Sequence, residues 1–138
     1  MTGRLLLDTC ALIWIALDQM ISTHARDALN TDMAAGELVS VSVISAWELG
    51  LLSAKGRLPT TQAPLSLFQD VVENRAVKIV ALSPEVLIGS SLLPGNFHSD
   101  PADRILVATA RQHDLTILTR DRAILAYGAG GHVRTLAC

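Results

Sequence analysis

Four carboxylates in this sequence lie where short strands end or helices begin. They are Asp8, Glu48, Asp103 and Asp121. Asp8 ends the apolar run 5–7, and Asp121 follows the β-rich run 116–119. In an open parallel sheet, the carboxyl ends of the strands and the helix starts that follow them meet at one edge. The four side chains are therefore expected to converge on one cleft.

Carboxylates in one cleft raise each other's pKa, because like charges a few ångströms apart disfavour ionisation. Hard divalent cations such as Mg²⁺ and Mn²⁺ remove this conflict, since they prefer oxygen ligands and retain several waters. The remaining coordination positions suit phosphate oxygens and a water made more nucleophilic by the metal. The chemistry favoured by this pattern is phosphodiester hydrolysis.

Each acid also has an ordinary structural explanation. Ser45 and Glu48 match a capping box, with Ser45 as the N-cap. Asp100 and Pro101 match a helix start, in which Asp103 complements the helix dipole. Asp8 could cap the following helix, and Asp121 could be a turn residue. The common position of the four acids is what favours a shared site.

Asp103 differs from a simple cap because it shares a helical face with apolar residues. These residues are Leu106, Val107 and Ala110. A carboxylate on the buried face of a helix needs a partner.

Short β-rich runs alternate with one or two helical segments along the chain, which predicts an α/β fold with a mostly parallel sheet covered on both faces. The expected strands are residues 4–8, 38–43, 77–82, 116–119 and 133–136. The expected helices are residues 11–17, 22–36, 45–54, 64–75, 84–92 and 101–113. The Ala/Gly-rich stretch 127–131 is expected to be a turn. One domain spanning residues 1–138 is expected.

The composition narrows the class of protein. Half of the residues are hydrophobic but only 4% are aromatic, which favours helices packed on a parallel sheet over an all-β sandwich. The cysteines, Cys10 and Cys138, allow at most one bridge, so a cytoplasmic protein is expected. Asp8 interrupts the apolar N-terminal stretch, and no other run is long enough to span a membrane.

The net charge of −2 argues against a strong non-specific nucleic-acid binder. Four arginines of the C-terminal third are nevertheless expected close to the acids: Arg104, Arg111, Arg120 and Arg122. The histidines show no metal-ligand spacing; they are His24, His98, His113 and His132. Trp14 and Trp47 are expected in the core or in an interface.

The ordered motifs resemble PIN-domain ribonucleases, and most closely the VapC toxins of bacterial toxin–antitoxin modules. The matching segments are Leu-Leu-Leu-Asp-Thr at 5–9, Ser-Ala-Trp-Glu-Leu at 45–49, Asp-Pro-Ala-Asp-Arg at 100–104 leading into Ala-Thr-Ala at 108–110, and Thr-Arg-Asp at 119–121. They occur in the expected order and cover essentially the whole chain.

The resemblance implies a metal-dependent endoribonuclease with one or two Mg²⁺ or Mn²⁺ ions. The implied ligands are Asp8, Glu48, Asp103 and Asp121. The role of Asp100 is open between N-cap and auxiliary ligand, and Thr9 and Thr119 would hydrogen-bond to the ligands. Family substrates are structured RNAs, often transfer RNA. Members usually form homodimers and are inhibited by a cognate, VapB-like antitoxin.

Three other functions share part of this pattern. A phosphotransferase of the haloacid-dehalogenase type needs a second Asp two residues after the first, where this chain has Cys10. A receiver-like phosphoacceptor needs a suitably placed lysine, and Lys55 and Lys78 are poorly placed. The remaining rival is a PIN fold that serves as an RNA-binding or assembly module with little nuclease turnover.

Overall fold

The computed structural model describes residues 4–19, 22–34 and 39–138, except for the side chains of residues 32 and 33. Five strands form one sheet in this part of the chain: β1 (Leu5–Leu7), β2 (Ser40–Ser42), β3 (Lys78–Val80), β4 (Thr116–Thr119) and β5 (Arg134–Ala137). Their spatial order is β3-β2-β1-β4-β5, and every neighbouring pair is parallel. The predicted α/β fold is confirmed.

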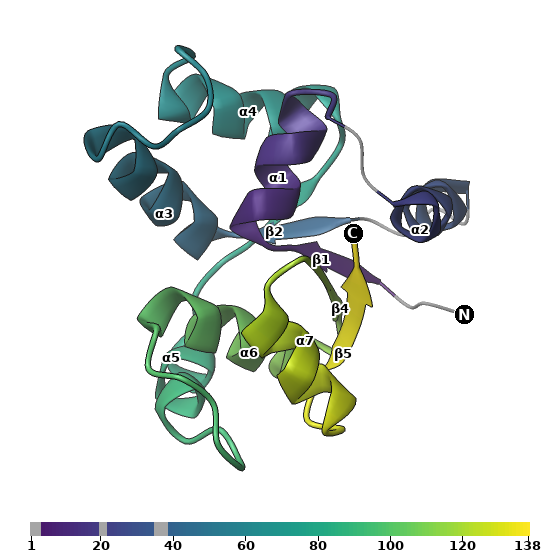
Figure 1. Ribbon diagram of the computed structural model, residues 1–138, viewed down its shortest axis with the longest axis vertical. Coiled ribbons are helices and arrows are strands. Elements are labelled where there is room, and N and C mark those ends of the chain that lie inside the picture. The colour runs from purple at the N-terminus through teal and green to yellow at the C-terminus, as the bar shows by residue number, and fades with distance from the viewer. Residues whose placement is uncertain (1–3, 20–21, 35–38) are drawn as a thin grey trace.

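Seven helices connect and cover the strands in the described residues (Figure 1). They are α1 (Thr9–Ala16), α2 (Thr23–Ala34), α3 (Val43–Ala54), α4 (Pro64–Asn74), α5 (Pro84–Ser91), α6 (Pro101–His113) and α7 (Arg122–Ala129). None of these helices is both long and apolar enough to cross a membrane. The predicted helix 22–36 includes residues 35 and 36, and the predicted strand 38–43 includes residue 38, which lie outside the described residues.

The central strand β1 supplies both sides of the core, because successive side chains of a strand point to opposite faces. Leu5 and Leu7 pack in one cluster with side chains of α1, α2 and α4. Leu6 packs in the other cluster with side chains of α6 and α7. All three leucines are fully buried, and Figure 1 shows the two helical layers on either side of the sheet.

The predicted turn 127–131 was wrong, because α7 extends through Ala129 before the chain turns at Gly130 and Gly131. Asp121 caps this helix, and its side chain accepts a hydrogen bond from the Ile124 backbone N–H at 3.0 Å. Ile124 and Tyr127 are buried on one helical face. The burial of these two side chains outweighs the low helix propensity of Gly128, the one glycine within α7.

Gly128 lies within α7 because the helix runs very close to β5. A Cβ atom at this position would lie 2.6 Å from the Thr135 hydroxyl oxygen, which is closer than two such atoms can approach. A residue that weakens an isolated helix is therefore required here by packing.

The capping box considered as the alternative role of Ser45 and Glu48 is not formed. The N-cap of α3 is Ser42, whose hydroxyl accepts a hydrogen bond from the Ile44 backbone N–H at 3.1 Å. Ser45 instead lies inside the first turn and is fully buried. This register frees Glu48 from the helix start, so its carboxylate is available for other contacts.

Candidate metal centre

Asp8 lies directly after β1 and is 5% exposed. Its carboxylate caps α1 by accepting a 2.7 Å hydrogen bond from the Ala11 backbone N–H, and it accepts a second bond from the Thr119 hydroxyl at the end of β4. Burial raises the pKa of Asp8, and the two hydrogen bonds partly offset this effect. The charge of Asp121 raises the pKa as well. The capping alternative is therefore correct, but it does not account for the burial.

Glu48 reaches toward β1 from the second turn of α3. Its carboxylate accepts a hydrogen bond from the Thr9 hydroxyl, whose oxygen also lies 3.0 Å from the Ser45 hydroxyl oxygen. A hydroxyl has one proton, so Thr9 donates to the carboxylate and can accept from Ser45. Burial is the main cause that raises the pKa of Glu48, and the charges of Asp100 and Asp8 add to it.

Asp103 lies in the first turn of α6, with Asp100 as the N-cap. The Asp100 carboxylate accepts the Asp103 backbone N–H at 3.0 Å, as the helix start predicted. Burial raises the pKa of Asp103 to about 7, and the charges of Asp100, Asp121, Glu48 and Asp8 contribute to the rise.

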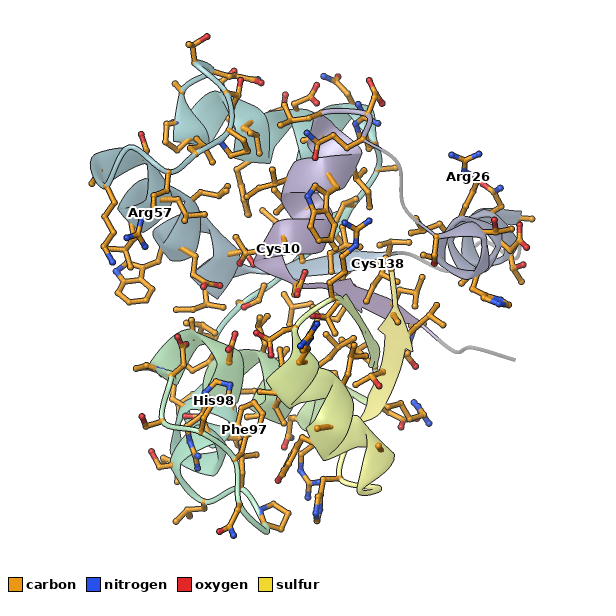
Figure 2. All side chains as sticks on the ribbon, in the orientation of Figure 1. Cys10, Arg26, Arg57, Phe97, His98 and Cys138 are labelled. Atoms are coloured by element: carbon orange, nitrogen blue, oxygen red, sulfur yellow. The ribbon has the colours of Figure 1, made fainter. Side chains whose placement is uncertain are left out.

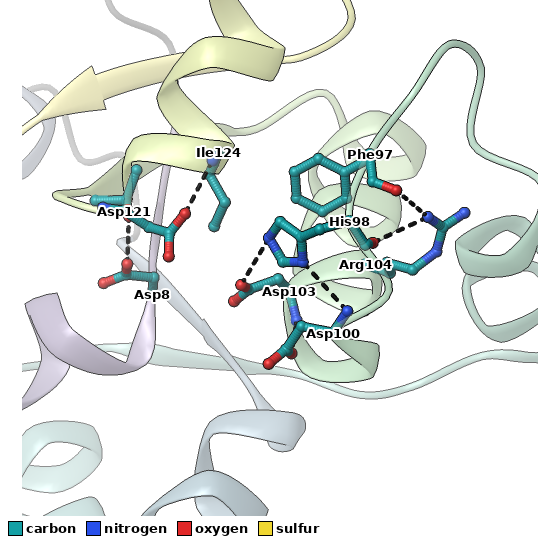
Figure 3. Close-up of polar contacts among 9 residues, drawn as sticks. Asp8, Phe97, His98, Asp100, Asp103, Arg104, Asp121 and Ile124 are labelled. Carbon is teal, nitrogen blue, oxygen red and sulfur yellow. Dashed lines mark hydrogen bonds and ion pairs between the residues drawn. The ribbon is translucent and has the colours of Figure 1, made fainter.

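Figure 3 shows Asp8, Asp103 and Asp121 at the carboxyl edge of the central strands. Glu48 lies close enough for its charge to act on Asp103 and for the charges of Asp8 and Asp100 to act on it. Oxygens of Asp103 and Asp121 and a ring nitrogen of His98 lie within 4.8 Å of one another. Cys10 lies near the same acids at the start of α1 (Figure 2). Burial first, and then the charges of all four acids, raise the pKa of its thiol to about 11.

His98 is the residue in this cluster that the sequence reasoning missed. Its Nε2 lies 3.2 Å from a carboxylate oxygen of Asp103. No ligand spacing signals this contact, because His98 lies on the loop before α6 rather than one turn away on the helix. The available signal was its position two residues before the helix cap Asp100.

The side chains of three arginines expected near the acids make other contacts. Arg104 follows Asp103, but its guanidinium donates to the carbonyls of Ser90, Phe97 and His98. Arg120 lies over the Trp14 ring at 3.8 Å and donates to the Cys138 carbonyl. Arg111 lies eight residues after Asp103 on α6, which corresponds to about 12 Å along the helix.

The donor set fits a hard divalent cation. It consists mainly of carboxylate oxygens, which Mg²⁺ and Mn²⁺ prefer. The raised pKa values of Asp8, Glu48 and Asp103 mean that the site holds negative charge at a cost when no cation is present. A cation would remove this cost.

Comparisons with known proteins agree with this fold and site. The model of the PIN domain family matches residues 5–129. The chain is 35% identical over 127 residues to "Ribonuclease VapC22" of Mycobacterium tuberculosis. The matched region covers 92% of this chain and 93% of that protein. The chain therefore belongs to the PIN-domain family, and within that family its similarity is to the VapC group.

Solved structures show the same fold. The VapBC structure from Salmonella typhimurium, which was determined bound to DNA, has a TM-score of 0.67 at 18% identity and covers 97% of each chain. The FitAcB structure from Neisseria gonorrhoeae has a TM-score of 0.65 at 22% identity and covers 96% of each chain.

Proposed function

We propose that this protein is a divalent-metal-dependent endoribonuclease that hydrolyses phosphodiester bonds in RNA. The observation that carries the proposal is the convergence of four carboxylates from four separate elements at one edge of the sheet. Thr119 joins Asp8 to Asp121, and oxygens of Asp103 and Asp121 lie within 4.8 Å of each other. Glu48 is held at the same edge by Thr9, the residue that follows Asp8. The similarity to a protein named as a ribonuclease supports RNA as the substrate class, and structured RNAs such as transfer RNA are the first candidates.

In this proposal, the acids hold one or two Mg²⁺ or Mn²⁺ ions: Asp8, Glu48, Asp103 and Asp121. A bound ion supplies Lewis-acid stabilisation of phosphate charge and a more acidic water. Thr119 and Thr9 orient Asp8 and Glu48 through their hydroxyl groups. Asp100 uses one carboxylate oxygen to cap α6, which leaves the other for an auxiliary contact with an ion.

The direct test is RNA cleavage by purified protein in Mg²⁺, in Mn²⁺ and in EDTA. Cleavage is expected with either cation and is expected to stop in EDTA. Asp8→Asn keeps the side-chain shape but removes its charge, so the rate should fall on the order of 10²-fold or more. Asp27→Asn is the matched control, because Asp27 is exposed on α2. Cleavage by Asp8→Asn at the wild-type rate would refute the proposal.

The proposed cellular role is that of a toxin inhibited by a VapB-like antitoxin. VapBC structures are among the solved neighbours, and the exposed side of the acidic site suits an arginine from a partner, because a guanidinium pairs bidentately with a carboxylate. Overproduction should arrest growth of the host, and a co-expressed antitoxin should relieve the arrest. Normal growth with soluble, RNA-cleaving protein would refute the toxin role.

A homodimer is the proposed assembly. The exposed apolar side chains Val43, Trp47 and Leu51 follow one face of α3, and Leu87 and Ile88 are exposed on α5. Figure 1 shows these two helices on the same side of the molecule. Exposed apolar surface of this kind is typical of interfaces. Trp47→Glu should convert a dimer to a monomer in analytical ultracentrifugation, whereas Leu65→Glu on α4 should not.

The alternative, an RNA-binding or assembly module with little turnover, is not favoured. A binding module has no need to retain four converging carboxylates with raised pKa values, since they would repel an RNA backbone in the absence of cations. RNA binding without cleavage at saturating Mn²⁺ would reverse this preference.

A further inference from the structure

His98 is held above Asp103 by contacts at both ring nitrogens (Figure 3). Its Nε2 lies 3.2 Å from Asp103 Oδ2. Its Nδ1 accepts a hydrogen bond from the Asp100 backbone N–H at 3.2 Å. The ring therefore joins the cap of α6 to the carboxylate in its first turn.

The loop that carries His98 is fixed from inside the protein. Arg104 donates through Nε to the Ser90 carbonyl at 2.7 Å, and through Nη1 to the carbonyls of Phe97 and His98 at 3.0 and 3.1 Å. The Tyr127 hydroxyl donates to the Pro94 carbonyl. These contacts fix the direction of the His98 ring, although the ring itself is partly exposed.

Tilted contacts between aromatic rings support the same loop. The Phe97 ring centroid lies 4.3 Å from that of His98 and 4.8 Å from that of Tyr127. Tyr127 is buried in the core between α7 and the sheet. Phe97 and Tyr127 thus form an apolar support for the loop that directs the His98 ring toward the acids.

The hydrogen bonds determine which ring nitrogen carries the proton. A neutral imidazole has one N–H donor and one acceptor nitrogen. Because Nδ1 accepts from Asp100, the proton lies on Nε2, where it points to Asp103. A nitrogen that carries a proton cannot bind a cation, so His98 in this arrangement donates to the site rather than ligating within it.

We propose that His98 is a positioning residue, which donates its Nε2–H to Asp103 Oδ2 and thereby leaves the other carboxylate oxygen of Asp103 for the cation. This inference rests on the proposed function, because it assigns Asp103 to the cation site. The rival role is direct ligation of the cation by Nε2. The short distances among His98, Asp103 and Asp121 would allow it. It requires, however, that the hydrogen bond from the Asp100 backbone N–H to Nδ1 break, because the ring proton would then have to lie on Nδ1.

The first measurement is nitrogen NMR of isotope-labelled, metal-free protein in mildly alkaline solution. The His98 ring is expected to show the proton on Nε2. A proton on Nδ1 would overturn the inference. His24 is exposed on α2, away from this site, and serves as the internal reference.

The second measurement is Mn²⁺ affinity by calorimetry in three full-length variants. His98→Ala should weaken binding by roughly 10-fold or more, as the loss of a hydrogen-bond partner of a metal ligand usually does. His98→Gln can place an amide N–H near the Nε2 position, so its affinity should stay within about 3-fold of wild type. His24→Gln should have no effect. Unchanged affinity in His98→Ala would overturn the inference.

Electron paramagnetic resonance of bound Mn²⁺ separates donation from ligation. No coupling to a directly bound nitrogen is expected in wild type, and a coupling that disappears in His98→Gln would establish ligation instead. None of these measurements depends on cleavage. If they agree with expectation while no RNA is cleaved, the proposed function fails and the role of His98 stands.

Discussion

Thr119 and Asp8, which are 111 positions apart in the sequence, are joined by a hydrogen bond from the Thr119 hydroxyl to the Asp8 carboxylate. The same hydroxyl oxygen accepts the Asp121 backbone N–H at 2.9 Å. One threonine at the end of β4 therefore holds two of the acids that form the candidate metal centre. The bond to Asp8 follows from the parallel pairing of β1 with β4, which aligns Leu7 with Leu118, whereas the bond from Asp121 is local to the end of β4.

Replacing Thr119 should separate the roles of its hydroxyl and its methyl group. Thr119→Val leaves the buried Asp8 carboxylate without one donor, so the free energy of unfolding should fall by about 1–3 kcal/mol. The rate of RNA cleavage should fall roughly 10- to 100-fold. Thr119→Ser keeps the hydroxyl and should retain most of the stability and most of the cleavage rate. Equal activity of the Val and Ser variants would show that the hydrogen bond does not position Asp8.

The metal-free protein should become less stable as the pH rises from about 4 to about 7. The pKa of Asp103 is about 7 in the folded protein, against an ordinary value of 3.8. Between these values the folded state binds more protons than the unfolded chain, so stability falls with rising pH. The shift corresponds to a few kcal/mol, at about 1.4 kcal/mol per pKa unit. Denaturant titrations in EDTA at several pH values measure this change in the free energy of unfolding.

Asp103→Asn is the matched variant for this pH dependence. It removes the charge that burial and the neighbouring acids disfavour, so at neutral pH in EDTA it should be more stable than wild type, and its stability should vary less with pH. Millimolar Mn²⁺ should raise the melting temperature of wild type by mass action and that of the variant by less. A variant that is less stable than wild type in EDTA would show that burial and repulsion of the Asp103 charge are not a net cost to the folded state.

Arg104 should contribute to stability rather than to RNA binding. Its guanidinium reaches three carbonyls at once, and a lysine ammonium cannot reproduce that planar arrangement. Arg104→Lys should lower the free energy of unfolding by about 1–3 kcal/mol and should weaken Mn²⁺ binding through the displaced His98. Arg111→Lys is the control, because Arg111 bonds to a single carbonyl, that of His132. Similar losses in both variants would contradict this assignment.

Asp8 and Asp121 were predictable from the sequence because strand ends in a parallel sheet share an edge. Asp8 directly follows an apolar run, and Asp121 follows a β-rich run with one intervening residue. Their meeting requires only that β1 and β4 be neighbours, which the observed order confirms. Glu48 was found for a different reason, since the motif resemblance identified it while its local pattern suggested a cap.

The features that were missed depend on tertiary contacts. Gly128 lowers the local helix propensity, and only the proximity of α7 to β5 explains why a glycine is present there. Ser42 and Ser45 are both good caps in isolation, and the end of β2 decides between them. His98 faces Asp103 because Arg104 and Tyr127 fix its loop, and no spacing along the chain records those contacts.

The most direct test of the metal centre is a calorimetric titration of Mn²⁺ into EDTA-treated, dialysed protein. Wild type should bind Mn²⁺, and Asp8→Asn and Asp121→Asn should each weaken the affinity by about 10-fold or more, because each loses a charged oxygen ligand. Asp27→Asn should bind as wild type does. No Mn²⁺ binding by folded wild-type protein, or equal binding by all four proteins, would contradict the claim that these acids form one cation site.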